Sequence, residues 1–157
     1  MILFTDFQTS VRRALGEIDP DWESYNGLII CGTHNQQNVE EMVEKIRIAK
    51  ERGVPALLIC GGHQLGAIEY ARNVLGIKDA TSEEFGQGIF VVKKRPQLKV
   101  GLHEGESWWS NYDVAIDYKI PDHFISVPYH PEYQSSKEKP HELLVEYLNR
   151  SNLTKKQ

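Results

Sequence analysis

At 157 residues the chain is long enough for one domain with a substantial hydrophobic core, and two domains are not expected. The net charge is −4 with both signs scattered along the sequence, so the composition predicts neither nucleic-acid binding nor an anionic-membrane surface. The first residues lack the features of a secretory signal and no stretch reaches membrane-spanning length, so we expect a cytoplasmic protein. In such a protein Cys31 and Cys60 are not expected to form a structural disulfide.

The first half of the chain alternates apolar runs of strand length with stretches of helical periodicity. We expect strands over residues 1–7, 27–31 and 56–59, and helices over residues 8–15, 38–51 and 63–75. Asn38 is the expected N-cap of the second helix. Strands that alternate with helices predict a parallel sheet with right-handed crossovers. Between residues 19 and 27 there is only a short connector with no apolar run that could form another strand.

The second half changes in character after residue 76. Short runs rich in β-forming residues, separated by proline and glycine, predict an antiparallel excursion over residues 88–92, 98–102 and 114–118. A strand is expected over 124–127 and an amphipathic helix over 140–150. We therefore expect one domain over residues 1–150 and a polar C-terminal tail over 151–157.

The centre of the pattern is an apolar run that ends at Cys60 and is followed by Gly61, Gly62 and a helix. This is the pattern of a nucleophile elbow, in which a buried strand turns sharply into a helix and glycine neighbours leave room for the strained turn residue. The N-terminus of the following helix favours a thiolate at Cys60 over a thiol. A cysteine beside an apolar run is more often an inert core residue, which is how we interpret Cys31.

A proton partner for Cys60 is expected in the segment His130-Pro131-Glu132. Proline fixes the backbone between an imidazole and a carboxylate, so Glu132 can hold one ring nitrogen of His130 while the other faces the sulfur. The residues therefore predict a nucleophile, a base and an orienting carboxylate in Cys60, His130 and Glu132.

These motifs resemble the class I glutamine amidotransferases, and within them the glutaminase domain of CTP synthase. The resemblance runs without gaps from residue 32 to residue 85 and resumes at 130–136. Its specific segments are residues 38–42, 52–55, 59–60, 62, 64, 68–74, 80–85 and 130–136. It implies an α/β fold of three layers with a flavodoxin-like parallel sheet. In the family another strand is inserted near residue 20, so the sheet of this chain is expected to be smaller.

The resemblance also implies roles for residues around the cysteine. The backbone N–H groups of Thr33 and Gly61 would form the oxyanion hole. Substrate would be bound by Gly32, His34, Gln64 and Glu84. No cofactor is implied. His34 and His63 could form a zinc site with Cys60, but the family commonly has a histidine at the position of His63 without any metal, so no metal is expected.

Two departures from the family concern substrate recognition. The family has a basic run that binds the glutamine α-carboxylate where this chain has residues 107–111, and it has glycine at the position of Leu58. Trp108 and Trp109 lie in the first of these stretches, where they could form a substrate platform or anchor the loop to the core.

The expected function is hydrolysis of the side-chain amide of glutamine through a thioester on Cys60, with release of ammonia to a separate synthase chain. Two alternatives remain. One is a stand-alone hydrolase of a γ-glutamyl-type amide. The other is a binding or regulatory module that has the fold without the turnover.

Overall fold

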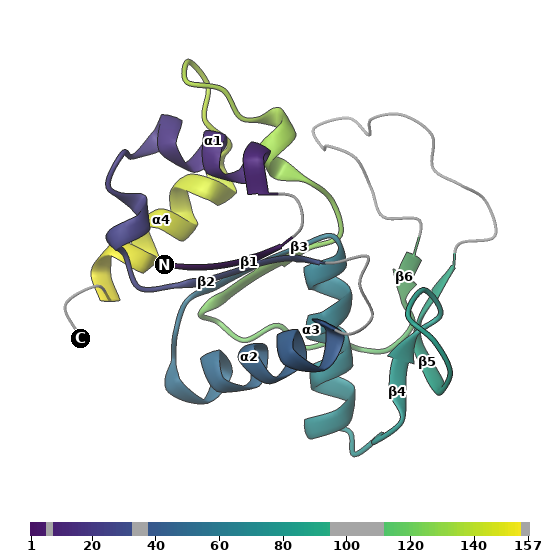
Figure 1. The fold of residues 1–157 in the computed structure, drawn as a ribbon. Helices are drawn as coiled ribbons and strands as arrows, with labels where there is room; N and C mark the ends of the chain where they lie inside the picture. Colours follow the sequence, from purple (N-terminus) through teal and green to yellow (C-terminus); the bar gives the residue numbers. More distant parts are fainter. Residues whose placement is uncertain (6–7, 33–37, 95–111, 155–157) are drawn as a thin grey trace.

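A parallel four-stranded sheet organises the protein in a computed structural model that describes residues 1–5, 8–32, 38–94 and 112–154. The strands stand in the order β1-β2-β3-β7, and every neighbouring pair is parallel (Figure 1). They are β1 (Ile2–Thr5), β2 (Leu28–Gly32), β3 (Ala56–Ile59) and β7 (Phe124–Val127). The expected α/β class with a parallel sheet is confirmed.

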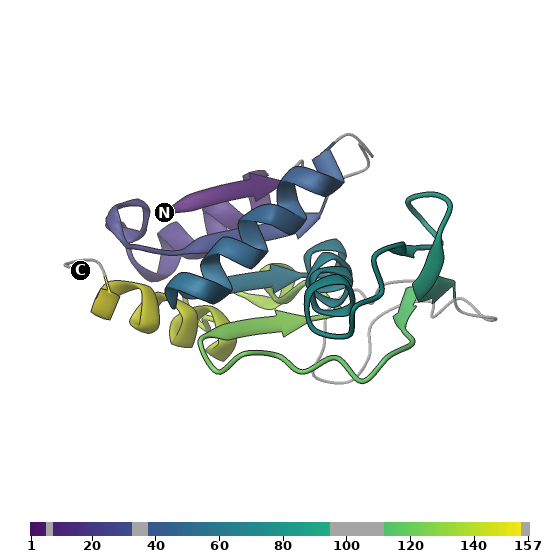
Figure 2. The ribbon, with the colours of Figure 1, turned by 90° about the horizontal axis from the view of Figure 1, so that it is seen from below.

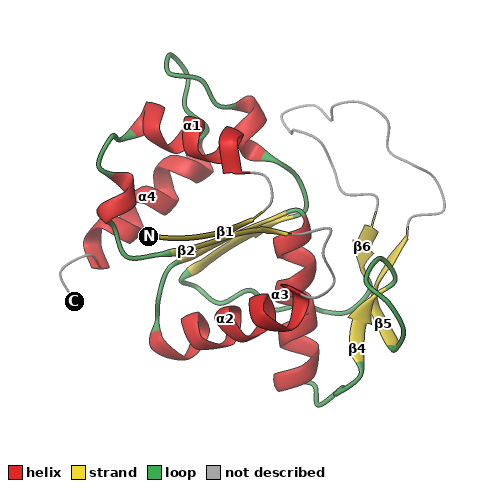
Figure 3. Ribbon diagram, viewed as in Figure 1, coloured by secondary structure: helices red, strands yellow, loops and turns green. Residues whose placement is uncertain are grey.

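Helices cover both faces of this sheet and make three layers (Figure 3). The helices α1 (Gln8–Ile18) and α4 (Glu142–Thr154) share one hydrophobic cluster with Ile29 and Leu57. The helices α2 (Val39–Arg52) and α3 (Gly61–Asn73) share the other with Ile30 and Leu58. Neighbouring strand residues thus belong to different cores, because successive side chains of a strand point to opposite faces. Such double coverage explains why the strands are apolar throughout.

The strand order reflects the short connector after α1. In the flavodoxin-like order 2-1-3-4-5 the first strand lies inside the sheet, whereas β1 stands at an edge here. If the second strand of the flavodoxin-like order is missing, the first strand becomes the edge strand, as β1 is here. The steps from β1 to β2 and from β2 to β3 go in the same direction across the sheet, but α1 and α2 lie on opposite faces (Figure 2). The two connections therefore have opposite hands, and the expected right-handed sense cannot apply to both.

The apolar stripes predicted for the first two helices are buried. Val11, Ala14 and Leu15 of α1 are fully buried, and Met42, Ile46 and Ala49 of α2 are at most 4% exposed. Asn38 occupies the predicted N-cap position of α2, with φ −85° and ψ −11°, but it makes no side-chain capping hydrogen bond. The burial of α2, rather than a capping side chain, accounts for its position.

A second, smaller sheet lies beside α3. It comprises β4 (Ala80–Ser82), β5 (Ile89–Lys94) and β6 (Tyr112–Val114). The pair β5–β6 is antiparallel as expected, but β4 was not predicted as a strand and pairs parallel with β5. The predicted run over 114–118 overlaps β6 only at its first residue, and the run over 98–102 lies outside the described residues.

The C-terminal helix begins and ends later than predicted. It runs over Glu142–Thr154, so residues 151–154 belong to the helix and not to the expected tail. Ser151 is fully buried and its hydroxyl donates to the carbonyl of Tyr147 at 2.9 Å, which explains a polar residue inside the helix. Across the described ranges, none of the helices is both long and apolar enough to span a membrane.

Two glycines give opposite predictions for stability. Gly16 lies inside α1 and a Cβ there would meet Trp22 Nε1 at 3.7 Å, an ordinary contact, so Gly16→Ala should raise the free energy of unfolding by about 0.5–1 kcal/mol. Gly53 ends α2 with φ +68°, so Gly53→Ala should lower it by about 1 kcal/mol or more. Urea unfolding of both variants checks the pair, and a loss of stability in Gly16→Ala would contradict the first expectation.

Candidate active site

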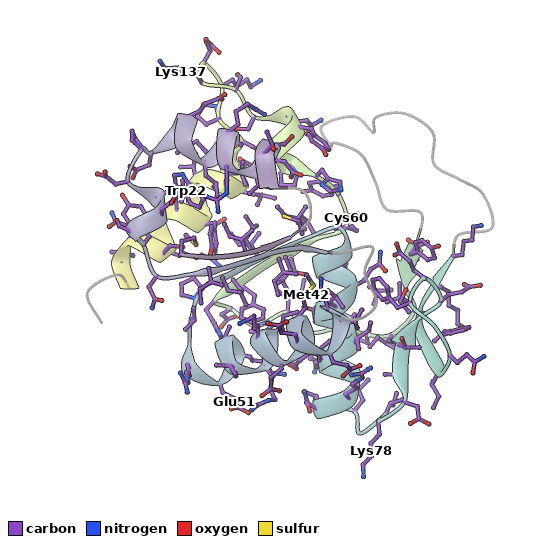
Figure 4. The ribbon with its side chains drawn as sticks, in the orientation of Figure 1. Trp22, Met42, Glu51, Cys60, Lys78 and Lys137 are labelled. Atoms are coloured by element: carbon purple, nitrogen blue, oxygen red, sulfur yellow. The ribbon has the colours of Figure 1, made fainter. Side chains whose placement is uncertain are left out.

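Cys60 occupies the turn between β3 and α3, as the elbow pattern predicts (Figure 4). Its backbone has φ 53° and ψ −103°, and among the described residues no other non-glycine residue has a positive φ. The Cys60 N–H donates to the carbonyl of Val127 at 2.9 Å, and the Cys60 carbonyl accepts from the N–H of Gln64 at 3.2 Å. The strained turn is thus held by hydrogen bonds to both β7 and α3.

The position of Gly62, two residues after Cys60, has no room for a side chain. A Cβ on Gly62 would overlap the backbone carbonyl oxygen of Ile30 on β2. The helix α3 therefore starts directly against the backbone of the neighbouring strand. It begins at Gly61, two residues earlier than the sequence indicated.

His130 lies directly after the segment that leaves β7, at the start of the short 3₁₀ helix η3 (Pro131–Gln134). Its Nδ1 lies 2.6 Å from Glu132 Oε1, and Cys60 lies near enough to raise the pKa of its imidazole. Glu132 is 1% exposed. The structure therefore brings Cys60, His130 and Glu132 together, with His130 interacting with both of the others.

The surroundings of His130 favour its protonated form. Burial by itself lowers the pKa of His130, but the hydrogen bonds to Cys60 and Glu132, with the charges of both, raise it from 6.5 to about 10. The ring of Tyr133 lies against the imidazole with centroids 5.1 Å apart. At neutral pH these surroundings favour the imidazolium form of His130.

The segment that carries Glu132 is anchored from α1. Arg13 donates from Nη2 to the carbonyl of Glu132 at 3.0 Å and from Nη1 to the carbonyl of Ser135 at 3.3 Å. Sequence reasoning missed this role of Arg13, because the two partners are separated by more than a hundred residues. An arginine on the exposed side of an amphipathic helix gives no signal of it.

The predicted substrate residues Gln64 and Glu84 are joined through Ser82. The Ser82 hydroxyl donates to Gln64 Oε1 at 3.1 Å and accepts from the backbone N–H of Glu84 at 3.1 Å. Ser82 is fully buried and Gln64 is 3% exposed. Ser82 was not predicted as a functional residue, although its position two residues before Glu84 is typical of a hydroxyl that caps a turn.

The other predicted site residues are placed only in part. Gly32 ends β2 and Gly61 begins α3, so both lie at the carboxyl edge of the sheet. Thr33 and His34 lie outside the described residues, as do Trp108 and Trp109. Cys31 is 2% exposed and belongs to the α1/α4 core. In the part of the chain that the structure describes, no group of three or more histidine, cysteine or carboxylate side chains is placed to hold a metal ion.

A cavity of about 520 Å³ lies away from Cys60. Its lining includes Arg72 from the last turn of α3, while Cys60 precedes the first turn. The Arg72 guanidinium is already bound to the carbonyl of Ala80 and to Glu40. Cys60 is not among the described residues that line this cavity.

The electrostatic role of Glu132 gives a direct prediction. Glu132→Gln should lower the pKa of His130 below about 10, because a charged partner that raises it is removed while the burial that lowers it remains. Titration of the labelled imidazole by NMR measures the shift. Glu142→Gln, which alters an exposed carboxylate on α4, serves as the matched control and should leave the titration of His130 unchanged.

The raised pKa of His130 also makes the free energy of unfolding depend on pH. The folded-state pKa of His130 is raised above 6.5, so its contribution to stability is fully present below about pH 6.5 and is lost as the pH rises through about 10. Glu132→Gln should reduce this loss. If the stability of Glu132→Gln declined with rising pH as steeply as that of the wild type, Glu132 would not be the cause of the raised pKa of His130.

Comparison with known proteins defines the class of this fold and site. The family model described as glutamine amidotransferase class-I matches residues 5–117. The chain belongs to the class I glutamine amidotransferase family.

Relatives found by sequence include CTP synthases. The CTP synthase of Methanoregula boonei is 44% identical over 75 residues, which are 48% of this chain and 14% of the relative. The CTP synthase of Bdellovibrio bacteriovorus is 28% identical over 201 residues, which cover 90% of this chain and 36% of the relative. The chain thus spans about a third or less of the length of these relatives.

A solved structure shares the fold. The glutaminase domain of Trypanosoma brucei CTPS with bound acivicin has a TM-score of 0.72 and 16% sequence identity. The match covers 96% of this chain and 92% of that one. The predicted resemblance to a CTP synthase glutaminase domain is confirmed at the level of family and fold.

Proposed function

We propose that the protein hydrolyses the side-chain amide of glutamine and releases ammonia. The observation that carries this proposal is the meeting of three residues at a strained strand-to-helix turn: Cys60 at the turn, His130 interacting with it, and the buried Glu132 bonded to His130. A nucleophile, a proton carrier and an orienting carboxylate in this order are the parts that amide hydrolysis through a covalent intermediate needs.

The first half of the reaction forms a thioester. The Cys60 sulfur attacks the amide carbonyl carbon, and the negative charge that develops on oxygen is stabilised by backbone N–H groups. Gly61 supplies one of these donors and Thr33 the other in our proposal. His130 gives its proton to the amide nitrogen as the carbon–nitrogen bond breaks, so ammonia leaves and the acyl group stays on sulfur.

The second half releases the acid. His130, now neutral, accepts a proton from a water molecule that attacks the thioester, and the carbon–sulfur bond breaks to give glutamate and free Cys60. Glu132 holds the ring through Nδ1 in both halves, so that the other nitrogen faces the reacting atoms. The raised pKa of His130 supports its role as the proton donor to the leaving group.

Recognition of the substrate is assigned to groups near the elbow. We place Gly32, His34, Gln64 and Glu84 around the bound glutamine, with Gln64 near its amide and Glu84 near its α-amino group. The hydrogen bonds of Ser82 to Gln64 and Glu84 support a common role of these two residues. The ammonia passes to a synthase in this proposal, in keeping with the CTP synthases among the relatives.

The test is release of ammonia and glutamate from L-glutamine by the purified protein, with Cys60→Ser as the blank and substituted γ-glutamyl amides as parallel substrates. Release of both products in equal amounts from glutamine supports the proposal. Release only from a γ-glutamyl amide would replace glutamine by that compound as the substrate. No Cys60-dependent release from any of them, with or without a synthase chain added, would contradict the proposal.

A further inference from the structure

His63 lies beside the proposed site without being one of its three residues Cys60, His130 and Glu132. It is in the first turn of α3, three residues after Cys60, so it moves together with the elbow. Its Nδ1 lies 2.6 Å from the hydroxyl oxygen of Ser126. Ser126 is 8% exposed and belongs to β7, the strand that leads to His130.

The elbow and β7 are therefore connected twice. One connection is the backbone hydrogen bond from Cys60 N–H to the carbonyl of Val127, and the other is the side-chain contact between His63 and Ser126. From Val127 only two residues lead to His130. Any change in the separation of α3 from β7 would thus change the distance between the sulfur and the imidazole.

Tyr118, which does not belong to the sheet, also lies against His63. Its ring meets the His63 imidazole edge-on with centroids 5.4 Å apart, and its hydroxyl lies near enough to Ser126 for that side chain to affect its pKa. Burial raises the pKa of Tyr118 to about 12 and lowers the pKa of His63 to about 4. Both groups are therefore neutral at pH 7, in contrast to His130.

The two histidines near the elbow thus have opposite surroundings. His130 is paired with a buried carboxylate, and His63 is buried against a hydroxyl and an aromatic ring. Environments that push two titratable groups apart indicate separate roles. A neutral, hydrogen-bonded imidazole suits a fixed structural contact rather than proton transfer.

We propose that His63, through Ser126, is a positioning residue for the amide hydrolysis proposed above, on which this inference rests. The contact sets the separation between the elbow and the strand that delivers His130, and so keeps His130 within hydrogen-bonding reach of Cys60. A misplacement of about 1 Å in such a pair can lower the rate roughly 100-fold.

The kinetic test uses His63→Ala, His63→Asn and His63→Gln. An asparagine amide reaches about as far as Nδ1 of histidine and can keep the contact with Ser126, whereas a glutamine amide lies one carbon further out. We expect kcat to fall about 10- to 100-fold in His63→Ala and His63→Gln, with KM changed less than about threefold, and largely to recover in His63→Asn. Equal kcat in all three variants and the wild type would overturn the proposal.

A double-mutant cycle separates positioning from a general loss of stability. Ser126→Ala should lower kcat as much as His63→Ala, and the double variant should be no slower than either, because both remove the same contact. His123→Ala is the control. His123 directly precedes β7, at the end of the strand far from His130, and its Nε2 contacts the carbonyl of Ala49. It should leave kcat unchanged even where it lowers stability, and a loss of kcat equal to that in His63→Ala would contradict the proposal.

A second readout does not depend on turnover. His63→Ala should lower the pKa of His130 below about 10, because separation from Cys60 removes a partner that raises it. NMR titration of His130 measures this in protein without substrate. An unchanged titration would overturn the positioning role even if glutamine proves not to be the substrate.

Discussion

Replacing Cys60 by serine should lower ammonia release roughly 10⁴- to 10⁶-fold, while the same change at Cys31 leaves kcat within a few-fold of the wild type. Loss of a catalytic nucleophile has effects of this size in other hydrolases that use a triad. Cys60 stands at the strained turn in contact with His130, and Cys31 is buried in the α1/α4 core.

The chemistry of this site explains why serine should not substitute. A thiolate attacks without losing a proton during the step, whereas a serine hydroxyl must give its proton to a base as it attacks. The hydrogen bond and charge of Glu132 favour the protonated form of His130, so the imidazole is a poor base for a hydroxyl at neutral pH. The site is therefore suited to a sulfur nucleophile.

The matched Cys31→Ser variant controls for the loss of a sulfur atom. It should cost about 1–3 kcal/mol of stability, because a hydroxyl is placed in an apolar core, and little in rate. Assays of ammonia and glutamate release by each variant, at equal folded fractions, test whether Cys60 is the nucleophile. Turnover that persists in Cys60→Ser, or that disappears equally in Cys31→Ser, would contradict the role of Cys60.

The elbow could be predicted from the sequence because it depends on neighbours in the chain. An apolar run, a cysteine and two glycines specify a strand, a turn and a helix within nine residues. His130 and Glu132 were also predictable as a pair, since one proline separates them. That these two segments meet followed from parallel strands, whose carboxyl ends lie at one edge of a sheet.

Contacts between distant segments could not be predicted in the same way. Arg13 binds a carbonyl 119 residues away, and His63 meets Ser126 across 63 residues. Neither residue forms a pattern with its neighbours that indicates the partner. Such contacts depend on how α1, α3 and β7 pack, which hydrophobic periodicity leaves open.

The differences in the fold have similar causes. The parallel pairing of β4 with β5 depends on the path of the chain after α3, and β4 has only three residues from which to recognise a strand. The helix α4 continues to Thr154 because buried Ser151 bonds back to the Tyr147 carbonyl, although serine there resembles the start of a polar tail. In both cases tertiary packing outweighs local propensity.

Gly62→Ala should lower the free energy of unfolding by about 3 kcal/mol or more, although alanine favours a helix over glycine by about 1 kcal/mol. A Cβ at this position would overlap the backbone carbonyl oxygen of Ile30. That oxygen belongs to β2, in the middle of the parallel sheet, so it cannot move without disturbing its strand pairs. The helix would have to withdraw from the sheet instead.

Gly66→Ala is the matched control in the same helix. There the Cβ would meet the hydroxyl of Tyr118 and, at 2.8 Å, the Cδ1 of Leu58, both of which are the ends of side chains that can shift. We expect it to cost less than half as much as Gly62→Ala in urea unfolding experiments. Equal losses would mean that β2 gives way as easily as a side chain. The tight contact between α3 and β2 would then not be what holds Cys60 in its strained turn.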